Sequence, residues 1–153
     1  MKKSYFMSML AVIMVALLNI GFTSCSNDDS DIPSIDGDPE GTVTVNLKRN
    51  SSESYSNMHI GEADVAFNSS CNLYINNGYI VSVGKVSGIS EIMNIPNTGW
   101  SHQAAAIPGT GYVVRKENGP SYPVYVVDFI KDVYGNITAV TLKYRRNWRS
   151  NTD

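Results

Sequence analysis

The side chains suited to catalysis in this chain are two histidines, two cysteines and scattered serines and acids. A serine nucleophile needs a base within hydrogen-bond reach, but Ser101 and His102 are sequence neighbours and would face opposite ways on a strand. His59 and His102 have no nearby cysteine, which argues against a zinc site. Asp128 and Asp132 would lie about 13 Å apart on one strand face, beyond the usual spacing of glycosidase carboxylates. The sequence therefore predicts no catalytic residue, no metal site and no cofactor.

Two isolated polar groups have a structural interpretation. Asp128 lies within an apolar strand, so we expect it to hydrogen-bond to the backbone or to an arginine. Cys71 is the only thiol besides Cys25, and a lone cysteine usually behaves as a small buried hydrophobe. A catalytic Cys71 would need a nearby base, for which the chain offers only its two histidines.

Aromatic side chains are the remaining candidates for ligand contact. Tyrosine and tryptophan on a β face can stack on sugar rings or anchor a protein partner, and they also fill cores. Trp100, Tyr112 and Trp148 are the candidate contact residues. Trp100 follows a Pro96–Gly99 turn and is either a plug over one end of the core or an exposed platform. We predict the plug, because the apolar run from Ala104 to Ile107 needs a cover.

The domain that positions these side chains is predicted to be all-β. Residues 42–48 alternate strictly between apolar and polar, as expected of a half-buried strand. Residues 73–76 and 79–83 flank Asn77-Gly78, a pair that suits the type I′ turn of a β-hairpin. We therefore predict a hairpin there.

The second half of the domain has further strand signals. We expect two short strands, 104–107 and 112–115, around the turn at 108–111. Residues 124–133 are rich in β-formers and predict a central strand. After a tight hairpin turn the chain returns over 137–146, with Val140, Leu142 and Tyr144 on one face and Thr141, Lys143 and Arg145 on the other. A single helical turn or packed loop is expected within 87–98.

These segments amount to about seven or eight short antiparallel strands with turns at fairly regular spacing. Such a pattern predicts one small β-sandwich or barrel-like domain over residues 42–153. Its ten Lys and Arg against eight Asp and Glu give a net charge of about +2, so no nucleic-acid partner is predicted. Four late bases are interpreted as a solvated strand end, with a weak anionic-partner site as the alternative: Lys143, Arg145, Arg146 and Arg149.

The N-terminal residues have the layout of a secretory signal. Lys2 and Lys3 precede the apolar run Met7–Ile20, which is short for a transmembrane helix. Phe22-Thr23-Ser24-Cys25 resembles the lipobox of bacterial lipoproteins. The resemblance implies a signal peptide over 1–24, removed before Cys25, and acylation of Cys25, which would tie the protein to a membrane through lipid. The alternatives are an uncleaved membrane helix and an ordinary signal peptide.

The segment after Cys25 is acidic. Residues 25–41 contain six acids and no base, and they hold too few apolar residues to order themselves. We interpret 25–41 as a flexible linker. Its start, residues 26–31, resembles the acidic signal that sends lipoproteins of Bacteroidota to the outer face of the outer membrane. The alternative is a generic acidic spacer.

The domain itself resembles that of small lipoproteins of gut Bacteroidota. The similar motifs are Gly84-Lys85-Val86, Gly99-Trp100, Pro108-Gly109-x-Gly111-Tyr112-Val113 and Lys143-Tyr144. The resemblance covers residues 42–146 and implies a β fold and a cell-surface setting, without a function or site residues.

The predicted function is a non-catalytic, surface-tethered module that binds a glycan or a protein. The alternatives are a structural component of an envelope assembly and, more distantly, a small hydrolase. An exposed aromatic strip would favour glycan binding, whereas an unpaired edge strand would favour assembly.

Overall fold

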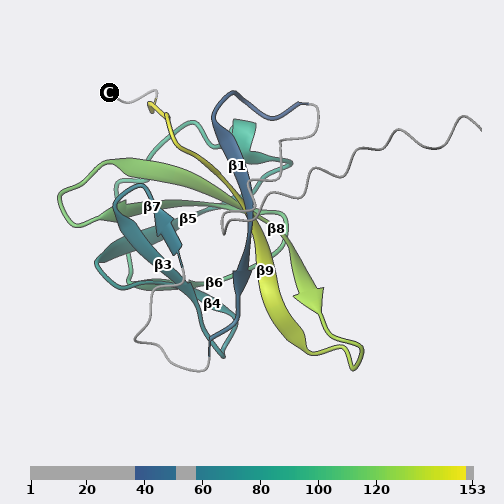
Figure 1. Ribbon diagram of the computed structural model, residues 1–153. Helices are drawn as coiled ribbons and strands as arrows, with labels where there is room; N and C mark the ends of the chain where they lie inside the picture. Colours follow the sequence, from purple (N-terminus) through teal and green to yellow (C-terminus); the bar gives the residue numbers. More distant parts are fainter. Residues whose placement is uncertain (1–36, 51–57, 151–153) are drawn as a thin grey trace, which may run out of the picture.

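The computed structural model describes residues 37–50 and 58–150, and this part of the chain forms two antiparallel sheets (Figure 1). One sheet has five strands in the order β1-β9-β8-β7-β5, and the other has four in the order β2-β3-β4-β6. The strands are β1 (Thr42–Lys48), β2 (Met58–Ile60), β3 (Ala63–Phe67), β4 (Asn72–Ile75), β5 (Gly78–Lys85), β6 (Gln103–Ala105), β7 (Thr110–Lys116), β8 (Ser121–Lys131) and β9 (Ile137–Arg145). The predicted all-β fold is confirmed, with nine strands in the described ranges where seven or eight were expected. Within those ranges no helix is long and apolar enough to cross a membrane.

The five-stranded sheet contains the best-predicted elements. Strand β8 lies at its centre, and β8 and β9 form the expected hairpin. The far end of this hairpin extends beyond the two sheets in Figure 1. The predicted inward face of β9 is confirmed, because Val140, Leu142 and Tyr144 are all buried. Strand β1 has the predicted bounds and pairs with β9 along its whole length.

Bridges at both edges join the two sheets, so the sandwich is partly closed like a barrel. Arg49, just after β1, makes an isolated parallel bridge with Phe67 of β3. At the other edge, Ser101 makes an isolated antiparallel bridge with Ile80 of β5. Residues 103–105 then pair with β4. The second bridge places the segment around Ser101 at a corner that both sheets share.

The hairpin predicted at Asn77-Gly78 is wrong, because β4 and β5 belong to different sheets. Neither residue has the positive φ of a type I′ turn. Asn77 instead accepts a hydrogen bond from the Asp64 N–H at 2.8 Å and donates one to the Glu62 carbonyl at 2.9 Å. The side chain of Asn77 therefore fastens the crossing between sheets to the β2–β3 turn.

The two short strands predicted around the turn at 108–111 are present as β6 and β7, and the turn between them is also a crossing between sheets. Strand β6 pairs with β4, whereas β7 lies between β5 and β8 in the five-stranded sheet. Gly109 supplies a positive φ of 75° at this crossing. Its N–H donates to the Val126 carbonyl at 2.9 Å, which ties the turn to β8.

The main core lies between the two sheets, and a second apolar cluster lies on the outer face of the five-stranded sheet. Val81 and Val113 belong to this second cluster, whereas the next residues along their strands, such as Ile80 and Val114, belong to the main core. A 3₁₀ helix at Ile89–Glu91 covers the second cluster and confirms the helical turn expected within 87–98.

Residues 38–41, the end of the predicted linker, are attached to the domain. Lys143 Nζ lies 2.6 Å from Asp38 Oδ2, and the Arg146 N–H donates to the Gly41 carbonyl at 3.1 Å. One of the four late bases is therefore paired with an acid of the predicted linker. The signal peptide, Cys25 and residues 25–36 lie outside the described residues.

Candidate functional site

The corner shared by the two sheets brings two ring side chains to one face. Ser101 accepts a hydrogen bond from Ile80 at 2.7 Å and donates one back at 3.0 Å, so this segment runs antiparallel to β5. Trp100 and His102 flank Ser101 and therefore share a side. That side is the outer face of the five-stranded sheet, because Trp100 packs against the second cluster.

Two more side chains reach the same face from β5 and β7. Tyr79 and Arg115 are direct partners in the β5–β7 register, and directly opposed residues have Cβ atoms about 4.5–5.5 Å apart. Both lie two residues from members of the second cluster, Val81 and Val113, and so share their face. We call Tyr79, Trp100, His102 and Arg115 the corner site. His102 is exposed and the other three are half-buried.

Arg115 and Trp100 form a cation–π pair in the corner site. The guanidinium carbon lies 4.0 Å from the centroid of the indole ring, a contact worth about 0.5–1 kcal/mol at exposed sites. The indole N–H donates to the Pro96 carbonyl at 3.0 Å. This hydrogen bond and packing on the second cluster fix the ring that supports the guanidinium.

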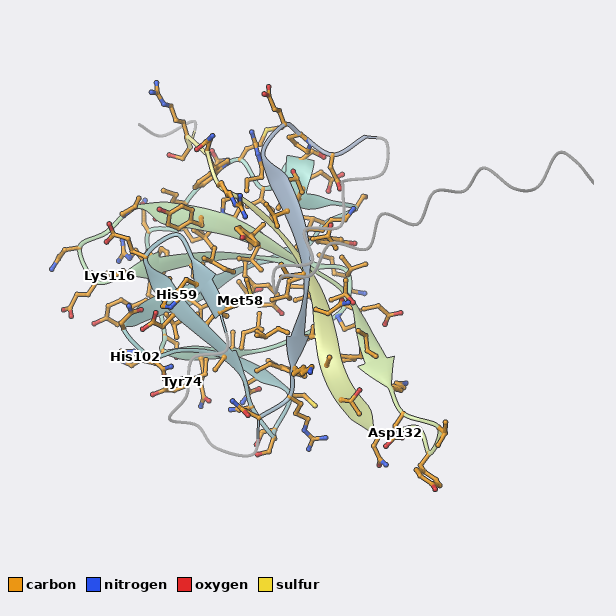
Figure 2. The ribbon with its side chains drawn as sticks, in the orientation of Figure 1. Met58, His59, Tyr74, His102, Lys116 and Asp132 are labelled. Carbon is orange, nitrogen blue, oxygen red and sulfur yellow. The ribbon has the colours of Figure 1, made fainter. Side chains whose placement is uncertain are left out.

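His102 and Tyr79 form the other half of the corner site. Their rings stack with centroids 4.8 Å apart and planes inclined at 28°. His102 Nδ1 lies 2.8 Å from the Gly78 carbonyl oxygen. Because a carbonyl only accepts, Nδ1 must carry the proton, which leaves Nε2 as the nitrogen open to a ligand. Figure 2 places His102 and Lys116 on the opposite side of the molecule from Asp132.

Arg115 forms no ion pair with an acid in the described part of the chain. Other bases there do, and examples are Lys116 with Glu62 and Lys143 with Asp38. Arg115 has an aromatic partner instead. The corner site therefore combines a cation held on a ring, a second ring pair and a histidine nitrogen open to solvent.

A groove of about 410 Å³ adjoins the corner site along the edge of β5. It is lined by Ser82, Val83, Val86 and residues 91–96, and it shares Pro96 with the hydrogen bond from Trp100. Ile80 directs its N–H and carbonyl toward Ser101. Ser82, two residues on, therefore directs its own backbone groups toward the same edge. The groove thus offers hydrogen-bonding groups beside apolar side chains.

The predicted contact residues have different outcomes. The prediction that Tyr112 contacts a ligand is wrong, because this side chain is only 1% exposed. Its hydroxyl donates to the Ala105 carbonyl at 2.6 Å. Burial raises the pKa of this phenol above its ordinary value. Trp100 does not plug an end of the main core, since it is half-buried on the outer face. Trp148 packs against the same second cluster, and its role as a ligand contact stays a prediction.

Both aspartates that were considered as a catalytic pair accept hydrogen bonds from the backbone of nearby residues. Asp128 Oδ1 accepts from the Phe129 N–H at 2.7 Å, so the expected backbone hydrogen bond is confirmed. Asp132 lies in the hairpin turn and not on the strand face assigned to it; it accepts from the N–H groups of Tyr134 and Asn136 at 2.9 Å. In the described ranges no three metal-binding side chains of the His, Cys, Asp and Glu types gather into a site.

Sequence reasoning found Trp100 but missed the other members of the corner site as a group. Arg115 is 15 residues from Trp100 and 36 from Tyr79 in sequence, and only strand pairing brings the three together. No local motif marks them. Comparisons with protein-family models, curated proteins and solved structures found no match for this chain.

Proposed function

We propose that this chain is a non-catalytic binding module that takes a glycan at the corner site. The observation that carries the proposal is that two ring contacts lie on one partly exposed face. Trp100 carries the guanidinium of Arg115, and Tyr79 stacks on His102. Ligand sites typically combine aromatic surface with a few placed polar groups. Sugars present both kinds of surface, because their rings have apolar C–H faces and hydroxyl edges.

The setting of this module is part of the proposal. The resemblance of residues 22–25 to a lipobox supports lipid attachment at Cys25, and the acidic residues that follow support a position on the outer face of an outer membrane. A lipid-anchored module there would hold its corner site toward the surroundings of the cell, with the acidic segment as a spacer.

A glycan array tests the proposal with the full-length chain in detergent. The variant Tyr79→Ala/His102→Ala removes one ring pair at the corner site. A matched control is Tyr134→Ala, because Tyr134 is an 86% exposed aromatic in the β8–β9 turn. We expect the parent and the control to bind the same glycans and the double variant to lose them. Equal binding by all three proteins, or no binding by the parent, would reject the proposal.

A second candidate function is assembly through the edge of β1. The hydrogen bonds of Gly41 and Arg49 with β9 fix the alternation of the strand, which directs the backbone groups of Thr44 and Asn46 away from β9. These groups bond to no other backbone in the described ranges. An edge of this kind can pair with another strand. Asn46→Pro removes one outward N–H and leaves the backbone bonds to β9 in place, although it also removes the Oδ1 that accepts from the Thr141 hydroxyl at 2.9 Å. It should abolish any oligomer seen by sedimentation. A monomeric parent, or an oligomer that survives Asn46→Pro, would exclude assembly through this edge.

A further inference from the structure

The chemistry of Arg115 narrows the class of glycan that the corner site can take, an inference that rests on the proposed function. Neighbouring Lys116 has Glu62 at 3.5 Å, and Lys143 has Asp38 at 2.6 Å. Arg115 is half-buried but has no carboxylate within 4.0 Å in the described part of the chain. A partly desolvated cation without an acid is a ready partner for an anionic ligand.

The position of Arg115 over the Trp100 ring suits a guanidinium whose hydrogen-bonding edge is available. The guanidinium carbon lies over the ring, 4.0 Å from its centroid, and arginine characteristically stacks its plane on aromatic faces. A guanidinium stacked in this way keeps its five in-plane N–H donors at the edge of the stack. Their planar fork matches the two oxygens of a carboxylate. Because the hydrogen bond from Trp100 to Pro96 holds the ring, less conformational entropy is lost at this site when a ligand binds.

The same stacking reduces the surface that a neutral sugar would use. One face of the Trp100 ring is covered by Arg115, and Tyr79 shares a face with His102. A neutral sugar gains mainly from an open aromatic face, whereas a charged sugar gains from the guanidinium itself. An acid beside the site would oppose this; Glu62, which reaches the neighbouring Lys116 of β7, is paired with that lysine.

We propose that the corner site binds an acidic glycan and that Arg115 reads the carboxylate of a uronic acid through two parallel hydrogen bonds. His102, on the same face and stacked on Tyr79, contributes Nε2 as a contact for a hydroxyl of the same glycan. The ligand class is therefore a uronate-bearing polysaccharide, and Arg115 determines the preference for it over a neutral one.

Matched polymers test this inference on the full-length chain in detergent. Polygalacturonate, alginate and hyaluronate are each compared with a counterpart whose carboxylates have been reduced to alcohols. We expect at least one acidic polymer to bind about tenfold or more tightly than its reduced counterpart, a difference of about 1.4 kcal/mol. Arg115→Gln should abolish this preference, and Arg115→Lys should restore only part of it, because an ammonium cannot make the bidentate contact.

A charge-matched control separates a specific site from general attraction. Lys131→Gln removes one positive charge at the exposed end of β8. Lys131 precedes Asp132 in the chain, and Figure 2 shows Asp132 on the side of the molecule away from His102. We expect Lys131→Gln to keep the preference. Equal losses in Lys131→Gln and Arg115→Gln would overturn the role of Arg115. Equal binding of acidic and reduced polymers that still depends on Tyr79 would overturn the inference and leave the proposed function standing. Failure to bind any glycan would overturn both.

Discussion

Gly78 at the start of β5 is where a single added methyl group should do the most damage. A Cβ atom on Gly78 would lie 1.9 Å from the Arg115 carbonyl oxygen and 2.7 Å from Lys116 Cα. Both are backbone atoms of the neighbouring strand, so no side-chain rotation can relieve the contact. Cβ contacts shorter than 3.0 Å are essentially never seen. The variant Gly78→Ala must therefore push β5 and β7 apart at this end.

The size of the effect follows from that displacement. Moving the Arg115 oxygen from 1.9 Å to at least 3.0 Å from the new methyl group stretches the adjacent interstrand hydrogen bonds beyond a useful length. Each lost bond costs about 0.5–1.5 kcal/mol, and overpacking of a close site costs about 1–3 kcal/mol. We expect Gly78→Ala to lower the free energy of unfolding by about 3 kcal/mol, out of the roughly 5–15 kcal/mol typical of a domain.

Urea unfolding of the full-length chain measures this change. With a slope of about 1–3 kcal/mol per molar for small proteins, the midpoint should fall by about 1–3 M. Gly88→Ala is the matched control, because Gly88 has extended backbone angles and its nearest atom to a new Cβ, Ser90 Oγ, lies 4.0 Å away. That variant should stay within about 0.5 kcal/mol of the parent. If the two variants unfold at the same midpoint, the close β5–β7 approach at Gly78 is wrong.

Three further outcomes are expected. Tyr112→Phe removes the two hydrogen bonds that the hydroxyl makes to the Ala105 carbonyl and the Ile107 N–H and should cost about 0.5–1.5 kcal/mol for each bond in the same unfolding assay; no change would contradict those hydrogen bonds. The Asn136 side chain holds the pKa of Asp132 below its ordinary value, so the carboxylate stabilises the fold above its unfolded-state pKa and loses this effect as pH falls through the folded-state pKa. Asp132→Asn should therefore lower stability at pH 7, and this loss should shrink as the pH falls below the ordinary range of the carboxyl group; a loss that stays constant with pH would refute this. Cys25→Ala should move the protein from the membrane fraction to the soluble one, and retention with membranes would contradict lipid attachment.

The strands could be predicted from the sequence because their signals are local. The alternation in residues 42–48 fixes both the bounds of β1 and its inward face, where Val43 and Leu47 are buried. The apolar run of β8 likewise indicates a strand with neighbours on both sides. These patterns report the environment of each residue directly, so no knowledge of the rest of the chain is needed.

Strand pairing could not be predicted in the same way. Asn77-Gly78 favours a type I′ hairpin as an isolated sequence, but in the folded chain both residues make contacts that a hairpin would not allow. Asn77 is used to hold the β2–β3 turn, and Gly78 is used for the close approach of β7. Both contacts are made with residues that are distant in sequence. The turn propensity of two residues contributes a small free energy, and the free energy of pairing along whole strands outweighs it.

The corner site depends on that pairing at every step. If β4 and β5 formed the expected hairpin, Tyr79 would lie beside β4, and the edge of β5 that bonds to Ser101 would be occupied. Trp100 and His102 would then have no place on the outer face of the five-stranded sheet. The crossing at Asn77-Gly78 leaves this edge free and brings Tyr79 opposite Arg115. The same Gly78 accepts the hydrogen bond that orients His102. A substitution that disturbs Gly78 should therefore weaken glycan binding together with stability, whereas Tyr112→Phe should weaken stability alone.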